Sequence, residues 1–414
     1  MISSNLFERR MLLFRNQLYV LNLAAIFLTP GLAASFIIPR ESCFSLVRYG
    51  HETWFISKDL SGQKNQHRKL RDREQSTLHM CQLLGMNCAR PTDFTFSFMG
   101  FSQRGGITDK HSDGWGLAFY EGRGVRAFHD SSPCAHSPIA ALVRTYPSKT
   151  LNMISHIRFA TEGAVALENV HPFQREMWGI QWVFAHNGDV PKFKLSHNQP
   201  LPWLGDTPDG ERVYNPVGDT DSEACFCSIL NALKAKFDNL PTMPLLYEEL
   251  ARLTKQIVED EEDATIFNFL LACGEHVQFA YSWPGARPNS KVWNGLFYTI
   301  REPPFKMVQL MDCDYCVDFS EFCCDEDRVA VVATAPLTKD EAWIELERGQ
   351  LIMFDEGQPH IDPQQCHNCE QKGHGLKSKV LTQNSMREKN AIQSTAILAL
   401  DSRHTVTVHG GECI

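Results

Sequence analysis

The chain has 414 residues, which is enough for one large domain with tails or for two domains. Hydrophobic residues make up 43% of it and charged residues 21%, as is usual for a soluble globular protein. The net charge is −9, yet residues 1–80 carry 11 Lys and Arg against 6 Asp and Glu, so the acidic excess lies in the remainder. An acidic body argues against a nucleic-acid-binding protein, whose contact surface would be basic.

The first 79 residues imitate a signal peptide. Arg9-Arg10 precede a mostly apolar run from Leu18 to Ile38, and the small residues 33–35 follow the most apolar part of that run. Pro30-Gly31 interrupts it, which argues against a membrane-spanning helix. We interpret residues 1–79 as an upstream extension translated from an over-early start, with a targeting or pro-segment as the alternative.

Beyond residue 80, strand-like runs come first, helical patterns follow, and strand-like runs return. Strands are predicted at 116–120, 153–158, 181–186, 277–281 and 329–333, and helices at 221–237, 245–259 and 263–271. This order favours an α+β layered domain over alternating βαβ units. The sequence has no glycine-rich nucleotide-binding motif of the common types, and we predict no cofactor.

Met80-Cys81 reads as the start of an enzyme. If translation begins at Met80 and that methionine is removed, Cys81 carries a thiol nucleophile and a free α-amine on one residue. Model α-amines titrate near pH 7.7–8.0, which suits a general base at neutral pH. Such a nucleophile needs only an oxyanion hole in addition. With the preceding residues attached, the nitrogen of Cys81 is an amide, so we predict that the full-length chain is not the active species.

Short segments that follow Cys81 in a fixed order carry a family resemblance. They are Ser102–Gly106, Asp113–Gly116, His156–Thr161, Glu168–Phe173, Ala185–Gly188 and Thr220–Glu223. Together with Met80-Cys81 they resemble the class II, N-terminal nucleophile glutamine amidotransferases, and the second and fourth of them narrow the resemblance to stand-alone members of the YafJ type. The resemblance implies a four-layer αββα sandwich of the N-terminal nucleophile hydrolase type, which we place at residues 80–358.

The resemblance also assigns the chemistry. Cys81 Sγ would attack the γ-amide carbon of glutamine, and the α-amine of Cys81 would pass the proton to departing ammonia. The side chain of Asn187 and the backbone N–H of Gly188 would form the oxyanion hole, where each donor is typically worth roughly 3–4 kcal/mol of barrier. An Asn-Gly pair after an apolar strand also predicts a type I′ hairpin turn that would present both donors.

Free glutamine carries one carboxylate and one ammonium group, so its pocket should offer one cation and one anion. The resemblance assigns Arg158 to the carboxylate, with Thr161 adding a hydroxyl contact, and Asp221 to the ammonium. The alternatives are a strand-end salt bridge for Arg158 and a helix N-cap at Asp221 or Ser222.

Four further residues are predicted around this pocket. Arg104, in a Gln-Arg-Gly loop, is expected to support the Cys81 terminus and to belong to the substrate site, with a solvated loop arginine as the alternative. His156 and His171 are expected to fix strands around the pocket rather than to react. Trp115 lies between two glycines and is expected to pack against the nucleophile strand as a core residue.

The remaining cysteines suggest a metal site that we do not predict. Cys313-x-x-Cys316 lies near Cys323-Cys324, but residues 309–319 look like a strand, which would point Cys313 and Cys316 to opposite faces. Cys366 and Cys369 precede His374, but Lys379 stands where a fourth ligand would be needed. Residues 359–414 are predicted to form a polar, mostly disordered tail.

The sequence therefore predicts an amidohydrolase that cleaves the γ-amide of glutamine or of another γ-glutamyl compound through a Cys81 thioester. The alternative is a subunit without turnover of its own, which binds glutamine or donates ammonia to a partner synthase. The expected partner is a small-molecule substrate, with a homo-oligomer or a partner synthase in addition, and neither nucleic acid nor a membrane. A start at Met80 predicts a cytoplasmic protein, with export through the signal-like segment 9–35 as the alternative.

Overall fold

The computed structural model describes residues 44–49, 52–57, 81–160, 163–195, 199–206, 210–287 and 292–361. The chain divides into two units, Met1–Lys58 and Asp59–Ile414. In the first unit, strands β1 (Phe44–Tyr49) and β2 (Glu52–Ser57) pair as an antiparallel hairpin, which the sequence analysis did not predict. Thr161 and the tail beyond 361 lie outside the described residues.

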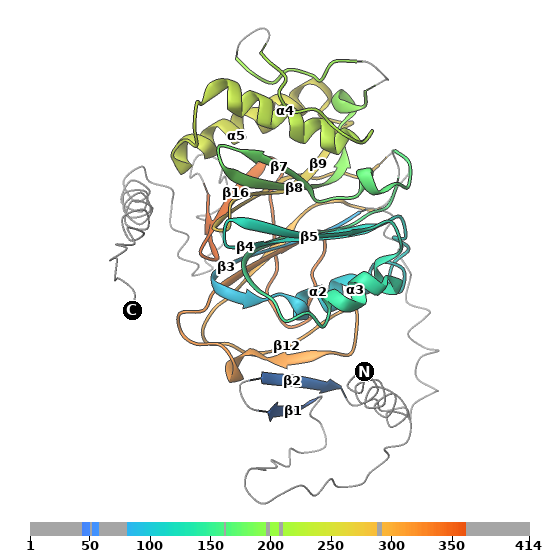
Figure 1. Ribbon diagram of the computed structural model, residues 1–414, viewed down its shortest axis with the longest axis vertical. Coiled ribbons are helices and arrows are strands. Elements are labelled where there is room, and N and C mark those ends of the chain that lie inside the picture. Colours follow the sequence, from blue (N-terminus) through green and yellow to red (C-terminus); the bar gives the residue numbers. More distant parts are fainter. Residues whose placement is uncertain are drawn as a thin grey trace, which may run out of the picture. The chain divides into compact units, whose positions relative to one another are not determined.

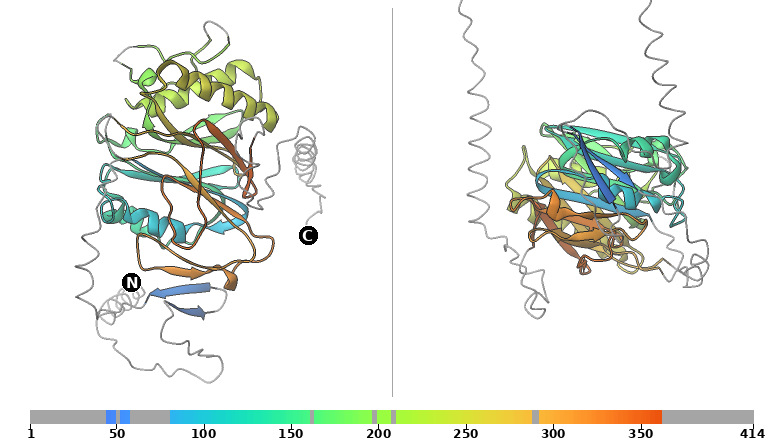
Figure 2. Two further views of the ribbon diagram at one scale, coloured as in Figure 1. Left: turned by 180° about the vertical axis from the view of Figure 1, so that it is seen from behind. Right: turned by 90° about the horizontal axis from the view of Figure 1, so that it is seen from below.

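The second unit consists, in its described part, of two antiparallel sheets packed face to face between two layers of helices (Figure 1). A six-stranded sheet has the order β17-β16-β10-β9-β8-β7, and a seven-stranded sheet has the order β15-β11-β14-β3-β6-β4-β5. Helices α4 (Asp221–Lys236) and α5 (Met243–Val258) cover the first sheet, and α2 (Thr95–Gln103) and α3 (Pro138–Val143) cover the second. The layers are seen again from behind in Figure 2. The predicted αββα sandwich is therefore confirmed.

The strands have the following bounds. The six-stranded sheet contains β7 (Phe173–Met177), β8 (Ile180–Asp189), β9 (Ile266–Cys273), β10 (Val277–Trp283), β16 (Gln350–Asp355) and β17 (Gln358–His360). The seven-stranded sheet contains β3 (Gln82–Asp93), β4 (Trp115–Glu121), β5 (Gly124–Asp130), β6 (Lys149–Ile157), β11 (Phe297–Arg301), β14 (Val329–Ala333) and β15 (Ile344–Glu345). A separate hairpin joins β12 (Met307–Gln309) and β13 (Cys316–Asp318). Short 3-10 helices lie at Cys134–His136, Leu167–Asn169, Pro191–Phe193, Glu259–Glu261 and Phe319–Glu321.

Three apolar cores hold these layers together. One lies under α4 and α5, a second lies under α2 and α3, and the third fills the space between the sheets. The inter-sheet core is rich in small residues, among them Ala118, Ala185, Ala272, Ala280 and Ala330. Gly85 belongs to the same close approach, because a Cβ there would lie 2.6 Å from Gln278 Oε1. Tight packing between the sheets brings the ends of β3 and β8 close enough to build one site.

Two of the secondary-structure elements predicted from the sequence were wrong. Residues 263–271 were predicted to be helical, but β9 occupies 266–273 and is buried at every position. A short apolar run has the same composition in a buried strand and a buried helix, and only burial on both faces decided between them. Residues 309–319 were predicted to form one strand, but they form the turn and flanks of the β12–β13 hairpin. Cys313 lies in that turn, so the argument from opposite strand faces does not apply to it.

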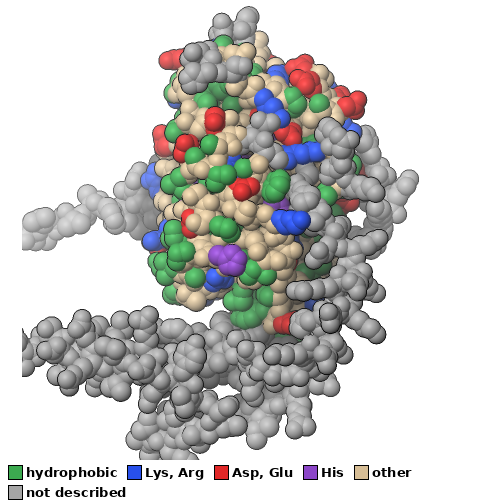
Figure 3. Space-filling model, turned by 90° about the vertical axis from the view of Figure 1, so that its right-hand side faces the viewer, with side chains coloured by type: hydrophobic (Ala, Val, Ile, Leu, Met, Phe, Trp, Pro, Cys, Tyr) green, Lys and Arg blue, Asp and Glu red, His purple; other side chains and the backbone are tan. Residues whose placement is uncertain are grey.

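One face of the second unit carries mixed charge. On the face shown in Figure 3, the coloured acidic and basic side chains are interspersed with hydrophobic ones and form no continuous basic stripe. No helix within the described ranges is both long enough and apolar enough to cross a membrane.

Candidate active site

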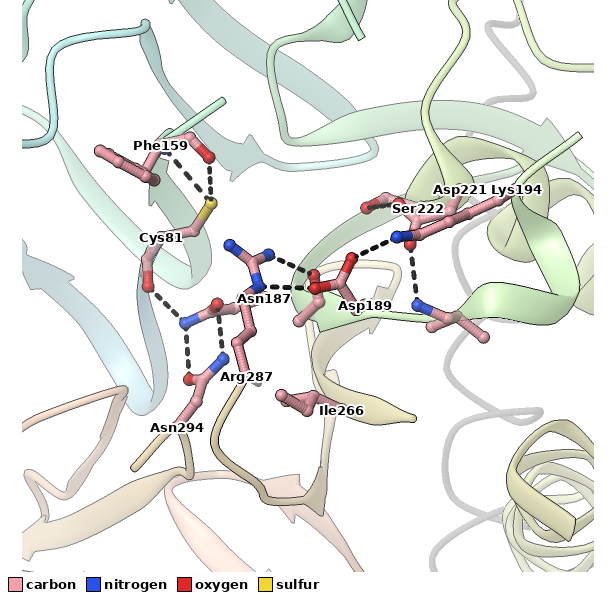
Figure 4. Close-up of polar contacts among 12 residues, drawn as sticks. Cys81, Phe159, Asn187, Asp189, Lys194, Asp221, Ser222, Ile266, Arg287 and Asn294 are labelled. Carbon is pink, nitrogen blue, oxygen red and sulfur yellow. Dashed lines mark hydrogen bonds and ion pairs between the residues drawn. The ribbon is translucent and has the colours of Figure 1, made fainter. Parts of the chain in front are cut away.

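Cys81 lies at the N-terminal end of β3, a central strand of the seven-stranded sheet that runs between β14 and β6. Cys81 directly precedes β3, whose first residue, Gln82, pairs with Ile157 at the end of β6. This pairing places Cys81 beside Phe159, whose N–H donates to Sγ at 3.3 Å and whose carbonyl oxygen accepts from the thiol at 3.4 Å (Figure 4).

The environment of Cys81 favours the protonated thiol. Burial raises the pKa of the Cys81 thiol, and the Phe159 N–H and the charges of Arg287 and Arg158 only oppose that rise. A thiol with a raised pKa is a weak nucleophile near neutral pH unless a base takes its proton. Within the described part of the chain, the hydrogen bonds of Sγ go to the main chain of Phe159, which is not a base. The site therefore needs a base from elsewhere.

Asn187 reaches Cys81 from the other sheet, and Gly188 follows it in the same strand. They are residues of β8, paired with Asn268 and Phe267 of β9, so the predicted hairpin turn at this position is wrong. The strand continues to Asp189 because its ladder partners on β9 extend to Ile266. Asn187 Nδ2 donates to the carbonyl oxygen of Cys81 (Figure 4).

Position 188 accepts only glycine. Its φ of +150° lies outside the range that side chains favour, and a Cβ there would lie 1.8 Å from the carbonyl oxygen of Ile266. The close approach of β8 to β9 thus requires the glycine of the Asn-Gly pair, which is also a candidate oxyanion hole.

Asp221 is the first residue of α4, and the structure corrects its predicted alternative role. The N-cap is Thr220, whose hydroxyl accepts from the N–H of Glu223 at 3.2 Å. Asp221 Oδ2 instead accepts from the N–H of Val190 at 2.8 Å, and Oδ1 accepts from Ser222 Oγ at 3.3 Å. The carboxylate, only 6% exposed, thereby ties the start of α4 to the end of β8.

Arg158 follows β6 and is 3% exposed. Its Nη1 donates to the carbonyl oxygen of Ala164 at 2.9 Å, and Nη2 to that of Gly163 at 3.4 Å. The guanidinium therefore holds Gly163 and Ala164 close to the end of β6. Its use as a carboxylate anchor stays a prediction.

Arg104 supports the nucleophile strand from behind. Its Nε bonds Asp312 at 2.9 Å, and its Nη1 donates to Gln82 Oε1 at 3.2 Å and to the carbonyl oxygen of Ala335 at 3.0 Å. Nη2 donates to the carbonyl oxygen of Pro336 at 2.5 Å. These contacts link the residue after Cys81 to two distant loops, and they place Arg104 against protein groups.

The two predicted histidines and the tryptophan are buried. The rings of His156 and His171 lie 4.2 Å apart between centroids, and burial lowers the pKa of each well below its usual value. Both are therefore neutral at pH 7. Trp115 packs on Phe98 at 5.6 Å in the core beneath α2 and α3, to which β3 also contributes.

Sequence reasoning missed three polar residues at this site. Arg287 Nε bonds Asp189 Oδ2 at 2.5 Å, and Asn294 Oδ1 accepts from Asn187 Nδ2 at 2.9 Å (Figure 4). Asp189 immediately follows the Asn-Gly pair, and that adjacency could have suggested it. Arg287 and Asn294 lie in the connection between β10 and β11, where no motif marks them. Among the described residues, no three His, Cys, Asp or Glu side chains converge as a metal site would require.

With this geometry established, comparison with known proteins places the chain in a family. Residues 80–378 match the model of the class II glutamine amidotransferases. This match spans well over half of the chain, so the protein belongs to the class II glutamine amidotransferase family.

Individual relatives agree with this assignment. The "Putative glutamine amidotransferase YafJ" of Escherichia coli K12 is 39% identical over 276 residues, covering 66% of this chain and 97% of that protein. A "Putative glutamine amidotransferase" of Haemophilus influenzae is 42% identical over 279 residues, covering 67% of this chain and 85% of that one. A solved "predicted glutamine amidotransferase" from Pseudomonas aeruginosa PA01 is 34% identical, with a TM-score of 0.48, and covers 67% of this chain and 99% of that chain. The resemblance to YafJ drawn from the motifs is thus confirmed.

Proposed function

We propose that the protein hydrolyses the γ-amide of glutamine or of another γ-glutamyl compound through a thioester on Cys81. One contact carries this proposal: Asn187 Nδ2 donates to the main chain of Cys81 itself. An amide donor therefore contacts the residue that carries the nucleophilic sulfur, which supports its assignment as a donor to the oxyanion of an acyl transfer. Gly188, whose backbone N–H is the second proposed donor, follows directly.

In the proposed reaction, Cys81 Sγ attacks the γ-carbonyl carbon, and the electron pair of the carbonyl double bond moves to oxygen. The thiol proton goes to the α-amine of Cys81, which then gives it to the leaving nitrogen as the C–N bond breaks. The amine or ammonia departs and leaves a γ-glutamyl thioester. Water adds to the thioester with the same amine as base, the C–S bond breaks, and the products are glutamate and the free thiol.

The base in this scheme is the α-amine of Cys81, which requires a chain that begins at this residue. The raised pKa of the Cys81 thiol supports this requirement, because the sulfur does not ionise readily unaided. The family match, which begins at residue 80, supports a functional start there as well.

Two of the charged residues predicted from the sequence supply the proposed substrate contacts. Arg158, with Thr161, holds the α-carboxylate of the γ-glutamyl group, and Asp221 holds its ammonium. Arg104 keeps the strand after Cys81 in place. His156, His171 and Trp115 fill the space behind the site, and they are assigned no proton transfer.

The decisive experiment compares the full-length chain with a form that starts at Met80. Each is incubated with glutamine and, separately, with a γ-glutamyl peptide, and released ammonia, amine and glutamate are measured. Intact mass shows whether Met80 has been removed. We expect turnover only from the form whose terminus is Cys81, with Cys81→Ala inactive. If neither form releases product, or if Cys81→Ala equals the wild type, the proposed function is wrong.

A further inference from the structure

Asn187 does not stand alone in its buried environment. Its side-chain amide forms a reciprocal pair with that of Asn294: Asn187 Nδ2 donates to Asn294 Oδ1 at 2.9 Å, and Asn294 Nδ2 donates to Asn187 Oδ1 at 2.8 Å. The two residues are 1% and 0% exposed. A carboxamide has a donor end and an acceptor end of nearly the same shape, so its partners decide which end faces the site.

The other contacts of the pair fix that choice. Asn187 Nδ2 faces the carbonyl oxygen of Cys81, which can only accept, and also lies 3.2 Å from the hydroxyl of Thr334. If the Asn187 amide turned over, its oxygen would meet the carbonyl oxygen of Cys81, and two acceptors would be buried against each other. With Asn294 Nδ2 occupying the Oδ1 side, the N–H end of Asn187 remains directed at the main-chain carbonyl oxygen of Cys81.

Asn294 is itself held firmly. Its N–H donates to the carbonyl oxygen of Gly285 at 2.8 Å, and the Gly285 N–H donates back to the carbonyl oxygen of Asn294 at 3.1 Å. Asn268 Nδ2 is a second donor to the carbonyl oxygen of Asn294, at 3.2 Å, and it also reaches the carbonyl oxygen of Asn187 at 3.3 Å. These bonds close the base of the connection between β10 and β11 and orient Asn294 toward Asn187.

Arg287, in the same β10–β11 connection, also binds Gly188, the residue after Asn187. Arg287 Nη2 donates to the carbonyl oxygen of Gly188 at 3.1 Å, while its Nε bonds the carboxylate of Asp189 at 2.5 Å. Lys194 Nζ lies 2.9 Å from the other carboxylate oxygen of Asp189. Figure 4 shows Arg287 between Cys81 and Asp189, with Asn294 on the opposite side of Asn187.

We propose that Asn294 is a positioning residue for catalysis, which holds the Asn187 amide with its N–H end toward the oxyanion, and that Arg287 is a second tether of the same donor pair. Asn294 acts through Asn187 and need not touch the substrate. This inference rests on the proposed function, because it assigns Asn187 to the oxyanion hole. The inference assigns a catalytic role to the connection between β10 and β11, which contains none of the family motifs.

A double-mutant cycle tests the inference. Asn187→Ala, Asn294→Ala and the double variant are compared with wild type in whichever form turns over glutamine, and kcat, KM and the Cys81 alkylation rate are measured. Loss of one oxyanion donor typically lowers kcat by about 10²–10³-fold, and we expect Asn294→Ala to lose about 10–10²-fold in kcat with KM changed less than about threefold. In the Asn187→Ala background, Asn294→Ala should change kcat by less than about twofold, because groups that act as one unit are not additive. Alkylation of Cys81 should continue at the wild-type rate.

Two controls separate positioning from a general loss of structure. Asn231 is also a buried asparagine, 1% exposed, and its side chain bonds Tyr214 at 2.8 and 2.9 Å. It lies roughly 15 Å along α4 from Asp221, so Asn231→Ala should lower the melting temperature without lowering kcat. Asn294→Ser, a smaller perturbation, serves if Asn294→Ala does not fold.

The outcomes of the cycle are distinct. A wild-type kcat in Asn294→Ala or Asn294→Ser overturns the positioning role, and so does a full, additive loss in the Asn187→Ala background. If wild type shows Cys81-dependent turnover but Asn187→Ala is fully active, the oxyanion assignment and the inference fail while the Cys81 mechanism stands. Absence of Cys81-dependent turnover overturns the proposed function and the inference together.

Discussion

Replacing Gly188 by alanine tests whether the close approach of β8 to β9 excludes a side chain at this position of the candidate oxyanion hole. The new Cβ would lie 1.8 Å from the carbonyl oxygen of Ile266 and 2.6 Å from its carbonyl carbon. Both are backbone atoms of the neighbouring chain segment, so relief requires the two segments to separate by more than about 1 Å, since carbon and oxygen rarely approach within about 3.3 Å.

The loss of stability in Gly188→Ala has two contributions, backbone strain and steric clash. Alanine substitutions at two other glycines measure them separately. Gly179 has a φ of +73°, and a Cβ added there would meet nothing within 4 Å, so Gly179→Ala reports backbone strain alone, about 1–2 kcal/mol. Gly124 has its nearest atom at 3.7 Å and no such φ, so Gly124→Ala should change the unfolding free energy by less than about 0.5 kcal/mol. For Gly188→Ala we expect a loss of about 3–5 kcal/mol, since the clash adds to the strain.

Urea unfolding measures the stability of the three variants, and glutamine turnover measures their activity. A displacement of about 1 Å at a catalytic donor can cost about 10²-fold in rate, so Gly188→Ala should lose at least that much kcat in its folded fraction. The two control variants should keep wild-type kcat. If Gly188→Ala were as stable as Gly179→Ala and fully active, the close approach of β8 to β9 and the role of this residue would both be refuted.

Three further outcomes are expected. Burial depresses the pKa values of His156 and His171, so below about pH 6.5 the unfolded chain binds more protons than the folded chain does. The contribution of these two residues to the unfolding free energy should be level above that pH and should fall by up to about 2.7 kcal/mol per pH unit below it. Urea titrations at pH 7.5 and 5.5 measure the change of the unfolding free energy with pH, and His171→Asn should make this change smaller. An equal change in wild type and variant would contradict the prediction. Arg287→Leu removes a charge that lowers the Cys81 thiol pKa, so the pH midpoint of Cys81 alkylation, followed by peptide mass, should rise, and by less in Arg287→Lys. An unchanged midpoint would exclude this electrostatic effect. Asp221→Asn should raise KM for glutamine about 10–100-fold, yet leave KM unchanged for an analogue that lacks the α-ammonium group; equal effects on both substrates would show that Asp221 is structural only.

Local sequence patterns predicted much of the fold and many residues of the candidate site. The strands around 117, 155, 183, 279 and 331 and the two long helices were predictable, because alternation, apolar runs and caps are properties of neighbouring residues. The predictions failed where local patterns allow two structures. The apolar run of β9 suits a buried helix as well as a buried strand, and the Asn-Gly pair suits a hairpin turn as well as a strand end. Asp221 and Thr220 are both favourable caps by residue type, and only the hydrogen bonds of Thr220 and Asp221 separated their roles.

The sequence by itself determined the family, the candidate nucleophile Cys81 and the order of motifs that supplies its polar partners. Each of these is written in a few adjacent residues. Only the tertiary structure decided that Asn187 meets Asn294, which is 107 residues away, and that Arg287 reaches past Gly188 to Asp189. Those contacts arise because the connection from β10 in one sheet to β11 in the other passes the end of β8. The identity of such neighbours depends on the register and the packing of whole sheets, and no local pattern of residues records it.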